Sequence, residues 1–190
     1  MKIILNPNRK EWTSILRRPT QNIKNIEFTV NQIFDDVMRN GDKAINKYTE
    51  LFDGASLESN MVTKEEMELA SNMVSEELKG AINFAKSNVE KFHLAQKTVK
   101  LEVETTPGVV CWQEKRPIEK IGLYIPGGTA PLFSTVLMLA IPAKIAGCKD
   151  IVLCTPPKKD GQVAKEILYT AKLCGVSKIY KVGGIQAIAG

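Results

Sequence analysis

Two glycine turns carry the side chains that are best suited to bind a ligand. The segment "GLYIPGGTAP" places Tyr124 ahead of Gly127-Gly128, and the segment "VGGIQA" places Gln186 behind Gly183-Gly184. Glycine lets a backbone approach a ligand closely, a tyrosine ring can stack on one, and a glutamine amide both donates and accepts hydrogen bonds. Neither segment matches the phosphate-binding patterns G-x-G-x-x-G or G-x-x-x-x-G-K-[ST]. The competing interpretation is that both are ordinary turns between a strand and a helix.

The other residue types that could do chemistry form no recognisable set. His93 is the only histidine, and Cys111, Cys148, Cys154 and Cys174 contain no C-x-x-C pair. A zinc site needs about four ligands at suitable spacing, so the sequence predicts none. The acidic pairs of the chain lie in polar helical stretches, and no Ser-His-Asp arrangement is visible. We therefore expect neither catalytic residues nor metal ligands in this chain.

The composition is that of a soluble globular protein. Of the 190 residues, 44% are hydrophobic and 25% are charged. No apolar run is long enough to cross a membrane, and the N-terminus does not resemble a signal peptide. The unpatterned cysteines have apolar neighbours and indicate buried thiols in a reducing cytoplasm. The net charge of +5 comes from scattered basic residues interleaved with acidic ones, so neither nucleic acid nor a membrane is expected as a partner.

The N-terminal part is predicted to contain an arm and a helical region. Residues 1–25 form a polar arm whose few apolar side chains, such as Trp12, need a surface to dock on, for example another subunit. Residues 26–117 are assigned to a mostly helical part of a first domain. Its last section, from about residue 98, is β-branched and partly alternating, which predicts short strands around a Pro107-Gly108 turn.

Local signals divide the helical region. Asn40-Gly41 predicts the end of one helix, and Asp42 is expected to cap the next. Thr63 opens a T-x-x-E capping box. Ser75 is expected to interrupt the long apolar pattern that follows and to cap a further helix.

Residues 118–190 are predicted to form an incomplete Rossmann-like domain. Strands at 120–125, 150–155 and 178–183 start about every 30 residues with helices between them, which indicates βαβ units with parallel strands. The carboxyl ends of parallel strands share one edge of a sheet, so both glycine turns should lie together at a ligand-binding edge. The fold class is therefore α/β: a helical N-terminal region followed by an incomplete parallel sheet in a three-layer α/β/α arrangement.

The helices between these strands can be placed approximately. An apolar helix is expected from Pro131 to Ala146, opened by Thr129 or Ala130 and broken or re-capped near Pro142. A second helix is expected over about 161–174. The final segment offers only a first helical turn, and a helix of six residues cannot stabilise itself. We therefore expect this chain to be a fragment of a longer protein.

Three segments together resemble the N-terminal half of the histidinol dehydrogenase family. They are "GDKAINKYTELFDG", "PGVVCWQEKRPIEKIGLYIPGGTAPLFSTVLMLAIPAKIAGC" and "VGGIQAIA". The resemblance implies an NAD-dependent, zinc-requiring enzyme that oxidises L-histidinol through L-histidinal to L-histidine, the last steps of histidine biosynthesis. It also implies a homodimer with incomplete Rossmann-like domains, in which 118–190 is a truncated NAD-binding domain.

The resemblance assigns roles to two residues. It implies that Tyr124 and Gln186 are NAD contacts, while the zinc ligands, the catalytic base and a further NAD contact are expected beyond Gly190. The chain by itself is then expected to be inactive. The alternative is a non-catalytic α/β module that stands alone and serves ligand binding or dimerisation.

Overall fold

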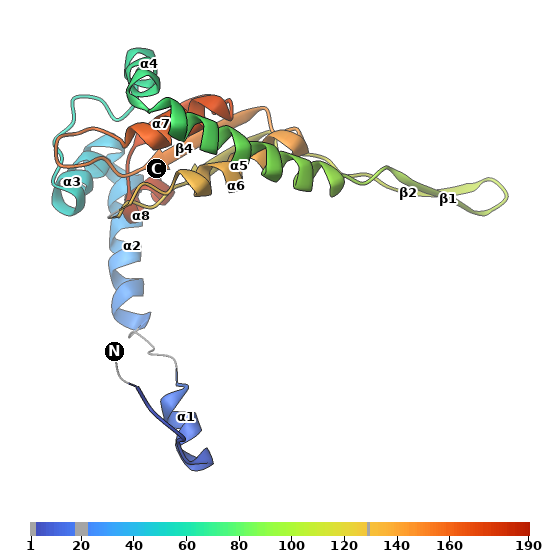
Figure 1. Cartoon of the computed structure of the whole chain (residues 1–190), viewed down its shortest axis with the longest axis horizontal. Coiled ribbons are helices and arrows are strands. Elements are labelled where there is room, and N and C mark those ends of the chain that lie inside the picture. The colour runs from blue at the N-terminus through green and yellow to red at the C-terminus, as the bar shows by residue number, and fades with distance from the viewer. Residues whose placement is uncertain (1–2, 18–22, 129) are drawn as a thin grey trace.

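The computed structural model describes residues 3–17, 23–128 and 130–190, in which helices precede and then alternate with strands (Figure 1). In chain order the elements are η1 (Arg9–Glu11), α1 (Trp12–Ile15), α2 (Ile23–Asn40), α3 (Asp42–Asp53), α4 (Lys64–Met73), α5 (Glu76–Ala95), β1 (Leu101–Thr106), β2 (Val109–Gln113), β3 (Lys120–Tyr124), α6 (Phe133–Ala146), β4 (Asp150–Thr155), α7 (Lys165–Leu173), β5 (Lys178–Lys181) and α8 (Gly184–Ala189). The α/β class expected from the sequence is confirmed.

The helix boundaries follow local capping chemistry. The Thr63 hydroxyl accepts from the Glu66 N–H at 3.1 Å, and the Glu66 carboxylate accepts from the Thr63 N–H at 2.8 Å, so the expected capping box is present. Ser75 caps α5, as expected. Asp42 is not a cap, however: α3 begins at Asp42 itself, and the preceding residue is Gly41 with φ of 53°. Glycine takes this left-handed conformation without strain, which lets α2 and α3 follow each other directly.

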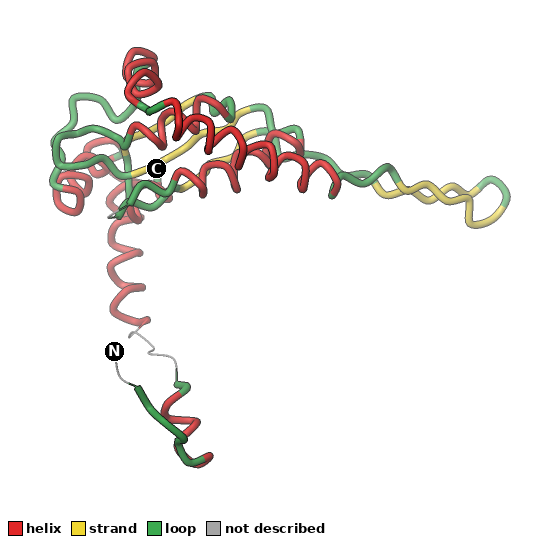
Figure 2. Tube along the Cα trace, in the orientation of Figure 1, coloured by secondary structure: helices red, strands yellow, loops and turns green. Residues whose placement is uncertain are grey.

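The core lies between a three-stranded parallel sheet and two helices. The strand order is β3-β4-β5, with β4 in the centre. Helices α6 and α7 pack on each other and cover one face of the sheet, while α5 packs on α6 and α4 packs on α7 (Figure 2). Along β4, Ile151 and Leu153 are buried against these helices, whereas the alternate residues Val152 and Cys154 are only half-buried. The second face of the sheet is therefore the more open one, bordered by α3 and α8.

Two expected helix starts were wrong. The first begins at Phe133 rather than Pro131, and it continues through Pro142 without a break; Thr129 lies outside the described residues. The second begins at Lys165 rather than near residue 161. Residues 158–162 instead form a turn in which the Gly161 N–H donates to the Lys158 carbonyl at 2.8 Å, and glycine at 161 has φ of 77°. Local turn chemistry thus shortens α7 at its N-terminus.

Strands β1 and β2 form an antiparallel hairpin that projects away from the rest of the chain (Figure 1). Every residue of both strands is exposed, including Trp112 at 63%. The short strands predicted here are confirmed. The described part of the N-terminal arm is also exposed, and its Trp12 indole donates only to the nearby Pro7 carbonyl at 3.3 Å. Among the described helices, none has both the length and the apolar character that a membrane crossing needs.

Candidate functional site at the carboxyl edge of the sheet

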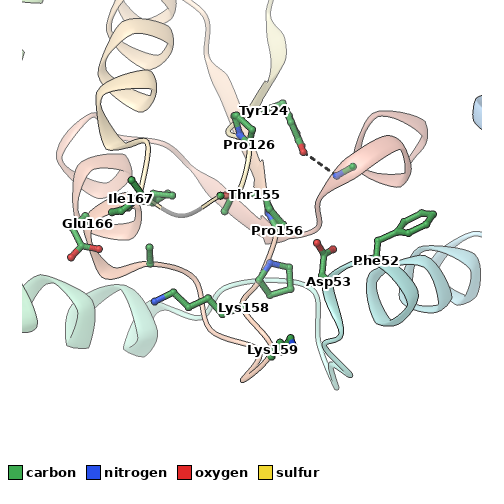
Figure 3. Close-up of a pocket in the computed structure, with 17 residues that line it drawn as sticks. Phe52, Asp53, Tyr124, Pro126, Thr155, Pro156, Lys158, Lys159, Glu166 and Ile167 are labelled. Atoms are coloured by element: carbon green, nitrogen blue, oxygen red, sulfur yellow. Dashed lines mark hydrogen bonds between the residues drawn. The ribbon is translucent and has the colours of Figure 1, made fainter. Parts of the chain in front are cut away.

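A direct hydrogen bond joins the two glycine turns. The Gly184 N–H donates to the Tyr124 hydroxyl at 3.0 Å, which links the end of β3 to the start of α8 (Figure 3). Tyr124 is the last residue of β3, and β5 leads into α8 through Val182 and Gly183. The parallel register carries both turns to the same edge of the sheet, as the sequence predicted.

Pro156 explains why glycine stands in both turns. A Cβ atom added at Gly127 would lie 2.6 Å from Pro156 Cγ, and one added at Gly183 would lie 2.5 Å from Pro156 Cβ. Neither distance is compatible with a side chain, because close-packed protein interiors have no space for such overlap. The proline after β4 is therefore held between the two turns, and all three strand ends contribute to one closely packed edge.

Gln186 lies beneath this edge with its amide unsatisfied. The residue is fully buried, and neither Oε1 nor Nε2 has a hydrogen-bond partner among the residues that the structure describes. A Cβ atom at Gly184 would lie 2.9 Å from Gln186 Oε1, so this amide is directly next to the residue that contacts Tyr124. Buried polar groups are nearly always paired, and an unpaired one in a native fold requires an explanation.

A cavity of about 790 Å³ opens at the same edge. It is formed by the end of α3, the loops after β3 and β4, the start of α7 and Gly184. Its lining is Phe52, Asp53, Tyr124, Pro126, Gly127, Gly128, Ala130, Pro131, Thr155, Pro156, Pro157, Lys158, Lys159, Ala164, Glu166, Ile167 and Gly184. This volume is within the range of small-molecule and cofactor sites.

Gln186 faces a second cavity, of about 590 Å³, on the open face of the sheet. Val152, Cys154 and Tyr180 supply its sheet side, and α3 and α8 supply its border. Tyr124 and Gln186 are therefore brought to the same edge but line different cavities, with Gly184 between them. Their proximity agrees with the positional argument from the sequence.

Asp53 is a site residue that sequence reasoning missed. Its Oδ2 atom is buried and has no hydrogen-bond partner in the described part of the chain. Burial raises the pKa of the Asp53 carboxyl above its usual range. Lys158 and Lys159 line the same cavity, and they follow β4, so the rule that ligands bind at the carboxyl ends of strands could have found them. That rule could not have found Asp53, since Asp53 follows no strand and reaches the edge only through the packing of α3.

Comparison with known proteins identifies the family. A sequence model described as histidinol dehydrogenase matches residues 16–190. The chain belongs to the histidinol dehydrogenase family. It is 54% identical over 189 residues to the histidinol dehydrogenase of Bacteroides thetaiotaomicron, covering 100% of this chain and 44% of that relative. Its identity to the Pasteurella multocida enzyme is 54% over 182 residues, covering 95% of this chain and 42% of the relative.

A solved structure from the histidinol dehydrogenase family has the same fold. The crystal structure of histidinol dehydrogenase from Elizabethkingia anophelis matches with a TM-score of 0.90 and 53% identity, covering 97% of this chain and 42% of that one. This chain thus spans less than half the length of the histidinol dehydrogenases it matches.

The histidine and the cysteines of this chain have surroundings that suggest no role in catalysis or metal binding. His93 Nδ1 lies 2.7 Å from Gln96 Oε1 near the end of α5. Within residues 3–17, 23–128 and 130–190, no three His, Cys, Asp or Glu side chains gather as metal ligands would. Burial raises the pKa of Cys154, and that of Cys174 to about 11, which suits unreactive thiols. Cys111 was expected to be buried, but it is exposed because the hairpin projects from the core.

Proposed function

We propose that this chain supplies part of the NAD site of a histidinol dehydrogenase. The intact enzyme would oxidise L-histidinol to L-histidinal and then to L-histidine in two steps, each passing a hydride to one NAD. The family assignment supports the reaction class. The observation that carries the cofactor assignment is the buried amide of Gln186, which has no hydrogen-bond partner among the described residues and lies next to the Tyr124–Gly184 contact.

The residues at this edge are suited to hold a dinucleotide. The Tyr124 ring offers a stacking surface at the end of β3, and its hydroxyl is oriented by the Gly184 N–H. The Gln186 amide can donate to one ligand atom and accept from another. Gly127 and Gly183 keep the backbone close to Pro156, which leaves the cavity beside them open. No G-x-G-x-x-G turn is needed for this arrangement.

We assign no catalytic base and no zinc ligand to this chain. Oxidation of an alcohol needs a group that accepts the hydroxyl proton, positioned within hydrogen-bond reach of it. Zinc would polarise the substrate oxygen. The described residues do not offer a ligand set that fits zinc, so no step is derived through the metal. We place these groups in the part of the longer relatives that this chain does not span.

Two further proposals concern the whole protein. We infer that it works as a homodimer, because the hairpin and the N-terminal arm expose apolar side chains that a second subunit could cover. We also infer a cytoplasmic location, because the four cysteines are free thiols, as a reducing compartment would keep them. The alternative is a non-catalytic α/β module that binds a ligand or dimerises on its own. The open reading frame that encodes the chain separates these possibilities: a frame ending near residue 190 would favour the module.

Steady-state kinetics of the full-length enzyme test the proposed function. Tyr124→Ala and Gln186→Ala should raise the KM for NAD more than the KM for L-histidinol, since both residues are assigned to the cofactor and neither to the alcohol. Gln96→Ala, near the end of α5 and outside both cavities, is the matched control and should change neither constant selectively. Unchanged NAD kinetics in both test variants would mean that these turns are ordinary strand–helix connections.

A further inference from the structure

The carboxyl end of β4 lacks an acidic residue that dinucleotide-binding sheets usually have. In doubly wound sheets, an Asp or Glu about 20 residues after the first turn, following the second strand, hydrogen-bonds a ribose hydroxyl of NAD. The order β3-β4-β5 makes β4 the second strand here. Yet β4 ends in Thr155-Pro156-Pro157, which offers one hydroxyl and no carboxylate.

Asp53 brings a carboxylate to this position from another element. It is the last residue of α3, and it lines the same cavity as Thr155, Pro156 and Pro157. Its carboxylate points into the space below the Tyr124–Gly184 hydrogen bond (Figure 3). Gly54 ends α3 with φ of 68°, and the Lys159 side chain packs over it, so the end of α3 is held against the loop after β4.

In the described part of the chain, no structural partner explains the position of the Asp53 carboxylate. Its Oδ2 atom is buried without a hydrogen bond, and no Lys, Arg or His nitrogen among the described residues forms an ion pair with it. Asp53 as a whole is half-buried, but a buried carboxylate oxygen without a partner is unfavourable for folding. It also stands at the C-terminus of a helix, where the helix dipole disfavours negative charge. Because of the unpaired oxygen and the helix dipole, removing the charge of Asp53 should not lower the stability of the fold.

We propose that Asp53 accepts hydrogen bonds from the vicinal ribose hydroxyls in the adenosine half of NAD and disfavours dinucleotides that carry a 2′-phosphate. This assignment rests on the proposed NAD site and deepens it. A vicinal diol supplies two O–H donors, which two carboxylate oxygens can accept together. A 2′-phosphate would instead bring a second negative charge next to the carboxylate.

Asp53→Asn tests this assignment, with Glu166→Gln as the matched control. Glu166 lines the same cavity, but its carboxylate points away from Asp53 (Figure 3). The purified chain and both variants are titrated calorimetrically with NAD and with NADP, and their thermal unfolding is recorded. Asp53→Asn should weaken NAD binding about tenfold or more, because hydrogen bonds to a charged group are lost. It should also narrow the preference for NAD over NADP without lowering the unfolding temperature.

The possible outcomes separate this inference from the proposed function. If the chain binds NAD but Asp53→Asn changes neither its affinity nor the preference over NADP, the role of Asp53 is wrong and the NAD site stands. An equal loss of NAD affinity in Glu166→Gln would also contradict the role of Asp53, since the effect would then come from the charge of the cavity as a whole. If only the full-length enzyme binds NAD saturably, the same variants are compared in that protein. If neither the chain nor the full-length enzyme binds NAD saturably, the NAD site and the role of Asp53 both fail.

Discussion

Gln186 and Asp53 both hold polar atoms in buried positions where the described part of the chain gives them no partner. Each such atom lowers stability by about 1–3 kcal/mol relative to a paired one. Residues of this kind persist where a ligand or another segment completes their hydrogen bonds. Their position around Gly184 and Pro156 is the strongest residue-level argument that this edge binds something.

Tyr124→Phe should release the Gly184 amide. The ring and its packing stay, but the hydroxyl that accepts from the Gly184 N–H is removed. We expect faster hydrogen exchange of the Gly184 amide by NMR and a stability loss of about 1 kcal/mol or less, because Gly184 is exposed and water can replace the hydroxyl. Tyr180→Phe is the control. Equal exchange rates for Gly184 in the two proteins would show that the contact is not formed in solution.

Gly184→Ala should destabilise the chain by about 1–3 kcal/mol. The position has φ of 58°, and the new methyl group would lie 2.9 Å from Gln186 Oε1. Gly80→Ala provides the contrast, since a Cβ there meets no atom within 4 Å and lies inside α5. That variant should gain about 0.5–1 kcal/mol from helix propensity. Urea unfolding measures the free energy of unfolding of both variants. Equal changes in this free energy would contradict the strained geometry at Gly184.

At the scale of elements, capping signals predicted the starts of helices better than apolar patterns did. The capping box at Thr63 and the cap at Ser75 are local interactions between residues three apart, so the sequence contains all that determines them. The start of α7 was missed because a turn at residues 158–162 replaces its expected first residues. The start of α6 was missed because Pro131 and Leu132 stay outside the helix, which begins at Phe133 without a side-chain cap. The positions of Asp53 and Pro156 could not be predicted, since they depend on how α3 packs against the loop after β4.

The contact between α2 and α3 should weaken in acid. Asp36 accepts from Lys47 at 2.7 Å, Asn40 at 2.7 Å and Tyr48 at 2.9 Å, and these bonds lower the pKa of its carboxyl from 3.8 to about 2. Because the pKa is lower in the folded state, the stabilisation is complete above the unfolded pKa and is lost as the pH falls from about 4 towards about 2. Asp36→Asn should therefore remove part of the loss of stability across that interval.

Urea unfolding between about pH 5 and about pH 2 measures this effect. Asp35→Asn, at an exposed position on the same helix that forms no ion pair with the described residues, is the control. It should retain the acid sensitivity of the unsubstituted chain. The same pH profile in the Asp36 and Asp35 variants would show that Asp36 does not link the helices.

At the scale of the whole molecule, the exposed hairpin indicates a missing partner surface. Leu101, Val103, Val109 and Cys111 share one face of the hairpin by strand alternation and register, and all are exposed. Exposed apolar patches of this kind commonly mark protein interfaces. The chain, of 21.0 kDa, should therefore self-associate at high concentration.

Val103→Lys should reduce this association, because it places a charge in the middle of the apolar face. Glu104→Lys, on the opposite face of the same strand, is the matched control and should have little effect. Light scattering over a range of concentrations gives the mass of each protein. A monomer mass at every concentration, or no difference between the two variants, would contradict a hairpin interface.

Calorimetric titration of NAD into the chain and into Gln186→Met tests the central claim most directly. Methionine keeps the approximate size of glutamine and removes both unsatisfied amide atoms, so thermal stability should stay the same or rise. We expect saturable NAD binding to the unsubstituted chain and a loss of affinity of about tenfold or more in the variant. Equal NAD affinity in the two proteins would show that Gln186 does not hold the cofactor, and a variant that loses both stability and affinity would show that Gln186 supports the fold instead.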